Sequence, residues 1–247
     1  MDYDIFSRYY DLLTEDVDYK GRTDYLTELF LKYDKLPSLL LDVGCGTGGF
    51  SLAFAQKGID VIGVDPSFGM LSVAREKAQE KGLDILFLNQ GGEELDLYGT
   101  VNGAISCLDT VNHITDKRTL QRFFNRVSLF LEKDRLFIFD VNTLYKQQHI
   151  LGNNTFVYDT EEVYCVWQNL FDKKAKITDI KLDFFCRENG VYTRKSEEFS
   201  ERVYEREALE SMLLKAGFNI VAVLGENTFT YPSKNCQRQI YIARKAI

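Results

Sequence analysis

A cluster of glycines and an aspartate early in the chain have the types and spacing that suit binding of a nucleotide-like ligand. The segment LLLDVGCGTGGF, residues 39–50, places four glycines within six positions directly after an apolar run. Glycine has no Cβ atom, so such a loop can turn tightly and bring its backbone close to a ligand. Asp65 follows Gly44 by 21 positions, where a carboxylate can accept hydrogen bonds from both hydroxyls of a ribose. We therefore predict that this loop binds a ligand containing a ribose.

Two ligands, NAD and S-adenosylmethionine, fit this pattern, and three features favour the second. Asp42 stands two residues before the first glycine, where its carboxylate would attract the ammonium of a methionine moiety and repel a pyrophosphate. Gly48 and Gly49 supply more glycine than a pyrophosphate on a helix N-terminus requires. No proton-relay signature of the form Y-x-x-x-K follows in a later predicted helix, since neither Tyr25 nor Tyr192 has a lysine four positions on.

The elements that must position this loop alternate between strands and helices. Apolar residues at spacings of three and four predict helices near residues 5–13 and 26–33, and Pro37 separates these from the first strand. Strands are predicted at 39–43, 60–65, 85–88, 103–108 and 135–141. Ser67 and Asp116 are predicted to cap two of the intervening helices. Such alternation predicts a parallel sheet covered by helices on both faces.

The pattern changes between residues 155 and 204, where long strand-like runs replace the helical period. Residues along 177–186 alternate with the period of a half-buried strand, and Asn189-Gly190 between two such runs is a strong hairpin signal. We predict an inserted antiparallel cap over residues 150–204. Packing explains most of its aromatic side chains, and the functional interpretation is that some of them close over the substrate. The remaining residues, 1–149 and 205–247, form the ligand-binding domain, completed by a helix over 206–215 and strands near 218–224 and 237–244.

The composition narrows the class of protein and its partners. The net charge of the 247 residues is −7, and no basic tract is longer than Lys173-Lys174, so nucleic acid is not an expected partner. No apolar run approaches the roughly 20 residues of a membrane span, and no secretory signal is evident at the N-terminus. The five scattered cysteines predict neither a disulfide framework nor a metal site. We expect a cytoplasmic protein with no metal and no membrane partner; the sequence does not specify an oligomeric state.

The motifs resemble those of the class I S-adenosylmethionine-dependent methyltransferases, and the resemblance covers the whole chain. LLDVGCGTGGF is similar to the first motif of that family, VIGVDPSFGML to the second, and GAISCLDTVNHI to the fourth-strand region beside the methionine. FDVNT and LLKAGF fit the C-terminal layout, and FSRYYDLL and DVDYKG look like the N-terminal helices of small bacterial members. The resemblance implies an α/β fold with a doubly wound, mostly parallel seven-stranded sheet and a reversed last strand. It also implies methyl transfer to a small molecule by direct displacement, which leaves S-adenosylhomocysteine.

The same resemblance implies which residues bind the cofactor. These are Tyr10, Asp42, Gly44, Cys45, Gly46, Gly48, Asp65, Met70, Gly91, Gly92, Cys107 and Leu108. Met70 would pack against the adenine, and Tyr10 would reach the carboxylate end of the methionine. Gly91 stands where relatives commonly have an aspartate that contacts the adenine amino group. In this chain the adenine contact would come from the backbone, from Gln90 or from Glu93, or be absent.

Polar residues near the expected methyl position are the candidates for catalysis. Asp109 and His113 follow the fourth predicted strand, and Tyr19 and Arg22 lie in the N-terminal segment. Methyl transfer from a sulfonium depends mainly on alignment of the nucleophile, the methyl group and the sulfur, and on exclusion of water. The lack of an obvious general base therefore does not argue against methyl transfer. We take Asp109, His113 and Tyr19 as the catalytic candidates and Arg22 as a contact for substrate or carboxylate. A cofactor-binding module without activity and an NAD-dependent oxidoreductase remain as alternatives.

Overall fold

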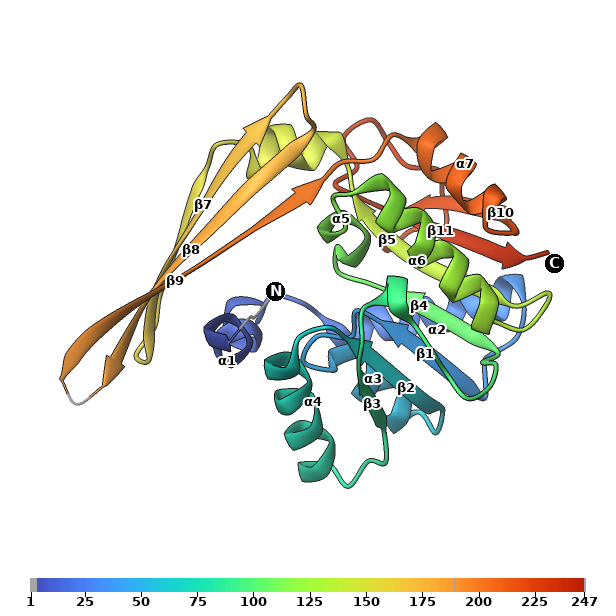
Figure 1. Cartoon of the computed structure of the whole chain (residues 1–247), viewed down its shortest axis with the longest axis horizontal. Helices are drawn as coiled ribbons and strands as arrows, with labels where there is room; N and C mark the ends of the chain where they lie inside the picture. Colours follow the sequence, from blue (N-terminus) through green and yellow to red (C-terminus); the bar gives the residue numbers. More distant parts are fainter. Residues whose placement is uncertain (1–3, 189, 247) are drawn as a thin grey trace.

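A computed structural model describes residues 4–188 and 190–246, which form two β-sheets (Figure 1). Within these residues the larger sheet has seven strands in the order β10-β11-β5-β4-β1-β2-β3. Their bounds are β1 Leu39–Val43, β2 Asp60–Asp65, β3 Leu86–Asn89, β4 Gly103–Ser106, β5 Leu136–Asn142, β10 Phe218–Gly225 and β11 Arg238–Lys245. Strands β3, β2, β1, β4 and β5 pair in parallel, whereas β11 is antiparallel to both neighbours. The predicted mostly parallel sheet with a reversed last strand is confirmed.

Helices cover both faces of this sheet. Within the described residues the helices are α1 Asp4–Leu13, α2 Tyr19–Tyr33, α3 Gly49–Gln56, α4 Phe68–Glu80, α5 Thr110–His113, α6 Lys117–Phe130 and α7 Arg206–Lys215, with the short helical segments η1 Gly92–Glu94 and η2 Lys146–Leu151. Helices α6 and α7 pack on one face and α2 and α3 on the other, so all seven residues of β5 are buried. Ser67 accepts from the Met70 amide at 3.2 Å and Asp116 from the Thr119 amide at 2.8 Å. Both predicted helix caps are therefore confirmed.

The end of β4 differs from the prediction, which extended this strand to residue 108. The strand stops at Ser106 because the backbone of Leu108 and Asp109 is left-handed, with φ angles of 56° and 71°. Left-handed φ angles cannot continue a strand, and they cost non-glycine residues about 1–3 kcal/mol each. Helix α5 begins directly after them and has only four residues, too few to show a periodic pattern in the sequence.

The second sheet is antiparallel and lies within the predicted insertion. It is formed by β6 Thr155–Asp159, β7 Val163–Asp172, β8 Ile177–Glu188 and β9 Val191–Arg202, and is called the cap below. It extends away from the large sheet, and α1 lies between it and α4 (Figure 1). The buried face of the predicted alternation is confirmed, since Thr178, Ile180, Leu182, Phe184 and Cys186 are all buried, the last four in one cluster with α1. On the other face Asp183 is also buried, where it pairs with Arg194. Glu188 pairs with Val191 across the predicted hairpin, and Gly190 has a φ of 81°; Asn189 lies outside the described residues.

Among the residues that the structure describes, no helix has the length and apolar character needed to cross a membrane.

Candidate functional site

A cavity of about 400 Å³ lies beside the carboxyl ends of strands β1, β2 and β4. In an open α/β sheet this edge is where ligands bind. Helix α1, the glycine loop and the segments after β2, β3 and β4 contribute its wall. Eight of the residues predicted to bind the cofactor are part of the wall: Tyr10, Gly44, Gly46, Asp65, Met70, Gly91, Gly92 and Leu108. The candidate catalytic residue His113 also lines it.

The glycine loop forms the floor of this cavity. Gly44 has a φ of 75°, and a Cβ atom at this position would overlap the side chain of Thr110. Gly46 has a φ of 54°, yet a Cβ atom there would meet no protein atom within 4 Å. The two glycines therefore have different roles. At Gly44 a side chain would overlap Thr110, whereas at Gly46 the absence of a side chain leaves the backbone open to the cavity. Such a cradle fits a ligand that lies against the main chain.

Asp65 lies at the end of β2 beside the loop. Its Oδ2 accepts a hydrogen bond from the Gly46 amide at 3.0 Å, and its Oδ1 accepts one from the Ser67 amide at 2.8 Å. Burial raises the pKa of Asp65, and these two backbone bonds oppose the shift. A carboxylate has about four lone-pair sites, so each oxygen can still accept from a ribose hydroxyl. The loop and the carboxylate that would hold the sugar are thus fixed to each other.

Four other predicted cofactor residues, Asp42, Cys45, Gly48 and Cys107, are not part of the cavity wall. Asp42 is 1% exposed below the loop and accepts a hydrogen bond from Ser51 at 2.6 Å. Burial raises the pKa of Asp42 to about 7. Cys45 and Cys107 pack in apolar clusters, and burial raises the pKa of both thiols well above the ordinary value. Gly48 adopts a φ of 80° at the start of α3, so it shapes the turn into that helix.

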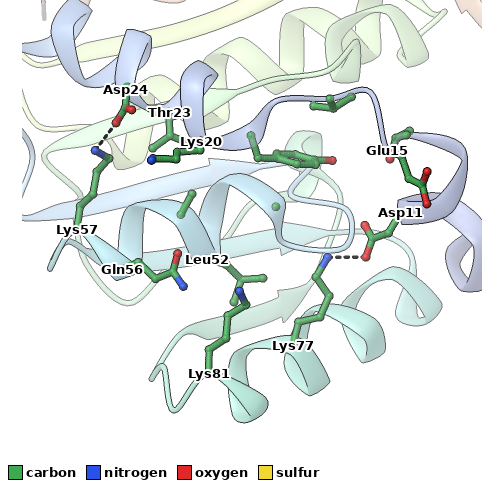
Figure 2. Close-up of a pocket in the computed structure, with 15 residues that line it drawn as sticks. Asp11, Glu15, Lys20, Thr23, Asp24, Leu52, Gln56, Lys57, Lys77 and Lys81 are labelled. Carbon is green, nitrogen blue, oxygen red and sulfur yellow. Dashed lines mark hydrogen bonds and ion pairs between the residues drawn. The ribbon is translucent and has the colours of Figure 1, made fainter.

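Tyr19, a catalytic candidate, contributes to the wall of a second cavity of about 560 Å³ between α2, α3 and α4 (Figure 2). Its ring covers Gly49, where a Cβ atom would overlap it, and packs edge-to-face on Phe50. Its hydroxyl contacts that of Tyr10, which lines the first cavity. Burial and the charge of Asp11 raise the pKa of Tyr19 to about 12. Tyr19 therefore does not line the first cavity, but contacts Tyr10, which does.

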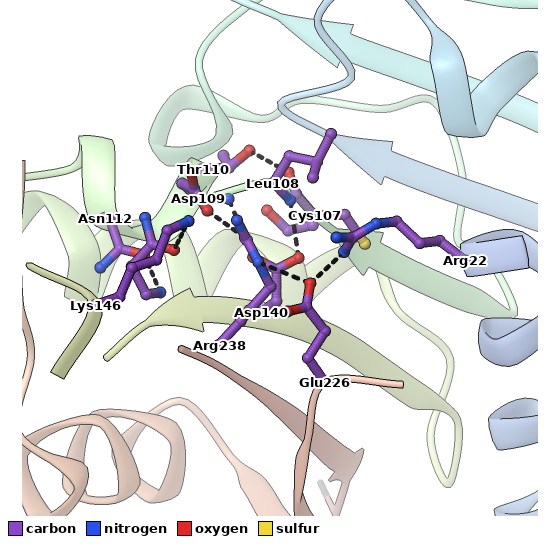
Figure 3. A network of polar contacts seen from close by, with 12 residues as sticks. Arg22, Cys107, Leu108, Asp109, Thr110, Asn112, Asp140, Lys146, Glu226 and Arg238 are labelled. Atoms are coloured by element: carbon purple, nitrogen blue, oxygen red, sulfur yellow. Dashed lines mark hydrogen bonds and ion pairs between the residues drawn. The ribbon is translucent and has the colours of Figure 1, made fainter. Parts of the chain in front are cut away.

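Asp109, another catalytic candidate, belongs to a buried network of charges rather than to the cavity wall (Figure 3). Its carboxylate pairs with Arg238, whose guanidinium also contacts Asp140 at 2.5 Å and Glu226 at 3.3 Å. Glu226 in turn pairs with Arg22 of α2 at 2.6 Å. Burial alone would raise the pKa of Asp109, but the Arg238 charge outweighs it and holds this pKa well below the usual range. Asp109 is thus ionised and held by the network.

His113 is the catalytic candidate that faces the first cavity directly. Its Nε2 lies 3.8 Å from Oε1 of Glu201 in the cap, and its ring packs on Phe199 with 5.1 Å between centroids. Glu201 also accepts hydrogen bonds from Asn142 at 3.1 Å and from Gln147 at 2.7 Å, and burial raises its pKa. Among the described residues, Nδ1 of His113 has no hydrogen-bond partner. The cap therefore supplies two residues that hold this imidazole at the cavity.

Comparison with known proteins connects this geometry to a family. Residues 40–134 match the model of the methyltransferase domain. A crystal structure of an S-adenosylmethionine-dependent methyltransferase from Clostridium acetobutylicum ATCC 824 has a TM-score of 0.87 and 32% sequence identity, covering 97% of this chain and 96% of that one. The chain belongs to the class I S-adenosylmethionine-dependent methyltransferases. A protein of Geobacillus sp. (strain WCH70) is 29% identical over 99% of this chain and 100% of its own length, and it is named as a methyltransferase.

The fold extends to more distant relatives of this methyltransferase. The sugar N-methyltransferase KedS8 from Streptoalloteichus sp ATCC 53650 has a TM-score of 0.79 at 15% identity, covering 96% of this chain and 93% of that one. At this identity the likeness concerns the fold alone. The cofactor of the methyltransferase is S-adenosylmethionine, which neighbouring structures contain.

The charge of the wall suits this cofactor. Asp65, Glu93 and Asp116 line the cavity, whereas the part of the chain described here contributes no lysine or arginine to it. S-adenosylmethionine carries a sulfonium, an ammonium and a carboxylate, so it is a net cation, and a cleft lined by negative charge attracts a cation. The cradle at Gly46 and the acidic wall therefore both fit the methyl donor.

Three residues that contact the candidate site from outside the cavity wall were not predicted from the sequence. Glu201, Asp140 and Arg238 lie far from the glycine motif and act through partners distant in sequence. Asp140 falls within FDVNT, a segment that the family resemblance had marked without assigning a role to this residue. Arg238 and Glu201 stand in strands without a local motif. Only the three-dimensional pairing shows what they contact.

Proposed function

We propose that this methyltransferase acts on a small-molecule acceptor that enters the cavity beside His113. The limited volume of the cavity is the observation that supports this proposal. Phe6 and Tyr10 of α1 form part of its wall, and α1 is packed between the cap and α4. A volume of about 400 Å³ leaves little space beyond a nucleoside cofactor, so the acceptor must be small or must insert only a small group.

The cofactor would span the cavity from β3 to β4. We assign Asp65 to the ribose, Met70 and the backbone of Gly91 and Gly92 to the adenine, and Leu108 and Tyr10 to the methionine moiety. Gly44 and Gly46 would support the middle of the ligand. Four residues outside the cavity wall would support the glycine loop and set the charge beneath it: Asp42, Cys45, Gly48 and Cys107.

When bound, S-adenosylmethionine supplies a methyl group activated by its sulfonium. The chain itself must align the acceptor with that methyl group and exclude water. We assign His113 to the acceptor, where its imidazole would hold the proton that a hydroxyl or amine loses. Tyr19 would orient Tyr10, and Asp109 would hold the loop before α5. Residues 150–204 would serve as the cap that closes this space.

The acceptor class can be tested with purified protein and S-adenosylmethionine. Incubation with panels of small amines, alcohols, phenols and thiols should produce S-adenosylhomocysteine with at least one compound, measured by mass spectrometry. A transfer RNA pool and a protein extract serve as parallel acceptors. Turnover confined to either macromolecule would contradict the proposal. His113→Ala should lower turnover with the active compound by about 10²–10⁴-fold if the imidazole acts as a general base.

A further inference from the structure

We propose that Asp140 and Arg238 are positioning residues for the methionine half of the cofactor. This inference rests on the proposed orientation of the cofactor in the cavity. Neither residue lines the cavity; they act through the backbone of Leu108 and Asp109, which follows β4.

The first step is the clamp that Asp140 places on this backbone. Its Oδ2 accepts from the Leu108 amide at 2.8 Å, and its Oδ1 accepts from the Asp109 amide at 3.0 Å. Both residues are in the left-handed region, which side chains other than glycine rarely adopt. One carboxylate thus holds two consecutive strained residues with both of its oxygens (Figure 3).

The second step is the role of Arg238, which keeps that carboxylate in place. Arg238 is 5% exposed and Asp140 is 3% exposed, so their 2.5 Å contact is shielded from water. Arg238 also pairs with the Asp109 side chain, so the same guanidinium holds the clamp and the residue that is clamped. Its third partner, Glu226, links the network to Arg22 in the N-terminal helix α2.

The third step is the position of the clamped backbone in the cavity. The strand order places β4 on the opposite side of β1 from β2 and β3. Asp65, Met70 and Gly91 line the β2 and β3 side, whereas Leu108 and His113 line the β4 side. With the nucleoside held on the first side, the amino-acid tail must extend towards Leu108. The left-handed turn both directs Leu108 to the wall and starts α5, which carries His113.

Two ligands that differ only beyond the sulfur separate this role from a general structural one. S-Adenosylhomocysteine contains the amino-acid tail, whereas 5′-methylthioadenosine ends in a methyl group and retains adenine and ribose. We expect Asp140→Asn to weaken S-adenosylhomocysteine binding at least tenfold and 5′-methylthioadenosine binding less than twofold, measured by calorimetry. Asp65→Ala should weaken both ligands alike. Asp34→Asn, which breaks the 3.4 Å pair with Arg135 outside the cavity wall, is the matched control and should alter neither.

A ligand-free measurement keeps this role distinct from the proposed cofactor site. Hydrogen exchange of the Leu108 and Asp109 amides should accelerate at least tenfold in Asp140→Asn and stay unchanged in Asp34→Asn. Arg238→Lys retains the positive charge but loses the forked guanidinium, so it should show the selective loss of S-adenosylhomocysteine binding and the faster amide exchange more weakly. This variant replaces Asp140→Asn if Asp140→Asn does not fold. Equal weakening of the two ligands, or unchanged exchange at these amides, would overturn the inference. Failure of the unaltered protein to bind either ligand would instead refute the proposed site.

Discussion

The β2 side of the cavity is built from residues close together in the sequence, whereas the β4 side is built from residues far apart. Asp65 and the Gly46 amide are separated by 19 positions, and Asp42 and Ser51 by nine. On the other side, Leu108 and Asp140 are separated by 32 positions, and Asp140 and Arg238 by 98. In the proposed site, the first side would hold its ligand with backbone and one carboxylate, and the second with a backbone segment positioned by a buried network of charges. Contacts between residues that are close in the sequence produce a recognisable motif, whereas contacts between residues that are far apart do not.

The largest expected effect comes from a comparison within the glycine loop. Gly44→Ala should lower the free energy of unfolding by about 2–5 kcal/mol, because left-handed backbone and overlap with Thr110 both oppose it. Gly46→Ala should cost only about 1–2 kcal/mol, from the backbone alone. Its methyl group instead enters the cavity and should weaken S-adenosylhomocysteine binding. Urea unfolding and calorimetry measure the two quantities; equal stability losses would contradict the distinct roles of these glycines.

Asp42 tests the charge balance below the loop through its pH dependence. Its folded-state pKa of about 7 exceeds the ordinary value of 3.8. Between these two pH values the folded protein keeps a proton on Asp42 that the unfolded chain has released. The stability from this group is complete below pH 4 and is lost as the pH rises through 7. Asp42→Asn removes this loss. Relative to the unaltered protein it should therefore gain about 2–3 kcal/mol between pH 5 and pH 8, at 1.36 kcal/mol per pKa unit.

Urea unfolding at several pH values measures this difference. Asp60→Asn is the control, since Asp60 is exposed at the start of β2. A stability difference between Asp42→Asn and the unaltered protein that does not change with pH would show that Asp42 is ionised in the folded state.

Glu201 tests the long-range side of the comparison. Glu201→Gln keeps the shape of the side chain but replaces one carboxylate oxygen with an NH2 group. Either the oxygen that accepts from Asn142 and Gln147 or the oxygen beside His113 is then lost. We expect a loss of about 1–3 kcal/mol in unfolding free energy, the cost of buried groups left without partners. Glu198→Gln, on the exposed face of the same strand beside Lys181, should lose less than about 1 kcal/mol. Similar losses in chemical unfolding would show that the cap does not depend on this buried carboxylate.

The smallest effect is expected where the cap meets α1. Oε1 of Glu197 accepts from the amides of Ile5 and Phe6, both at 2.9 Å, and so caps the start of that helix from another part of the chain. Glu197→Gln should cost about 1 kcal/mol, since it keeps an acceptor and loses a charge favourable at a helix N-terminus. Hydrogen exchange should then rise in the first turn of α1 and stay unchanged in α6. No change in α1 would contradict the contact.

The sequence allowed prediction of the sheet, its reversed strand and most helix bounds, because periodic burial and caps such as Ser67 are local signals. It also predicted eight residues of the cavity wall, through the family resemblance of several separate motifs. It did not predict the end of β4, because the left-handed turn at Leu108 depends on Asp140, a partner 32 positions away. Asp109 illustrates the same limit. Its position after a strand suggested a role in catalysis, and only the fold shows that Arg238 holds its carboxylate.

The most direct test of the account is calorimetric titration of the folded protein with S-adenosylhomocysteine, in parallel with Asp65→Ala. The account predicts saturable binding of one ligand per chain. Loss of charge-assisted hydrogen bonds to the ribose, worth about 1.5–3 kcal/mol, should weaken binding in Asp65→Ala by roughly ten- to a hundredfold. Absence of heat with the unaltered protein, or the same affinity in Asp65→Ala, would contradict the assignment of this cavity to the cofactor.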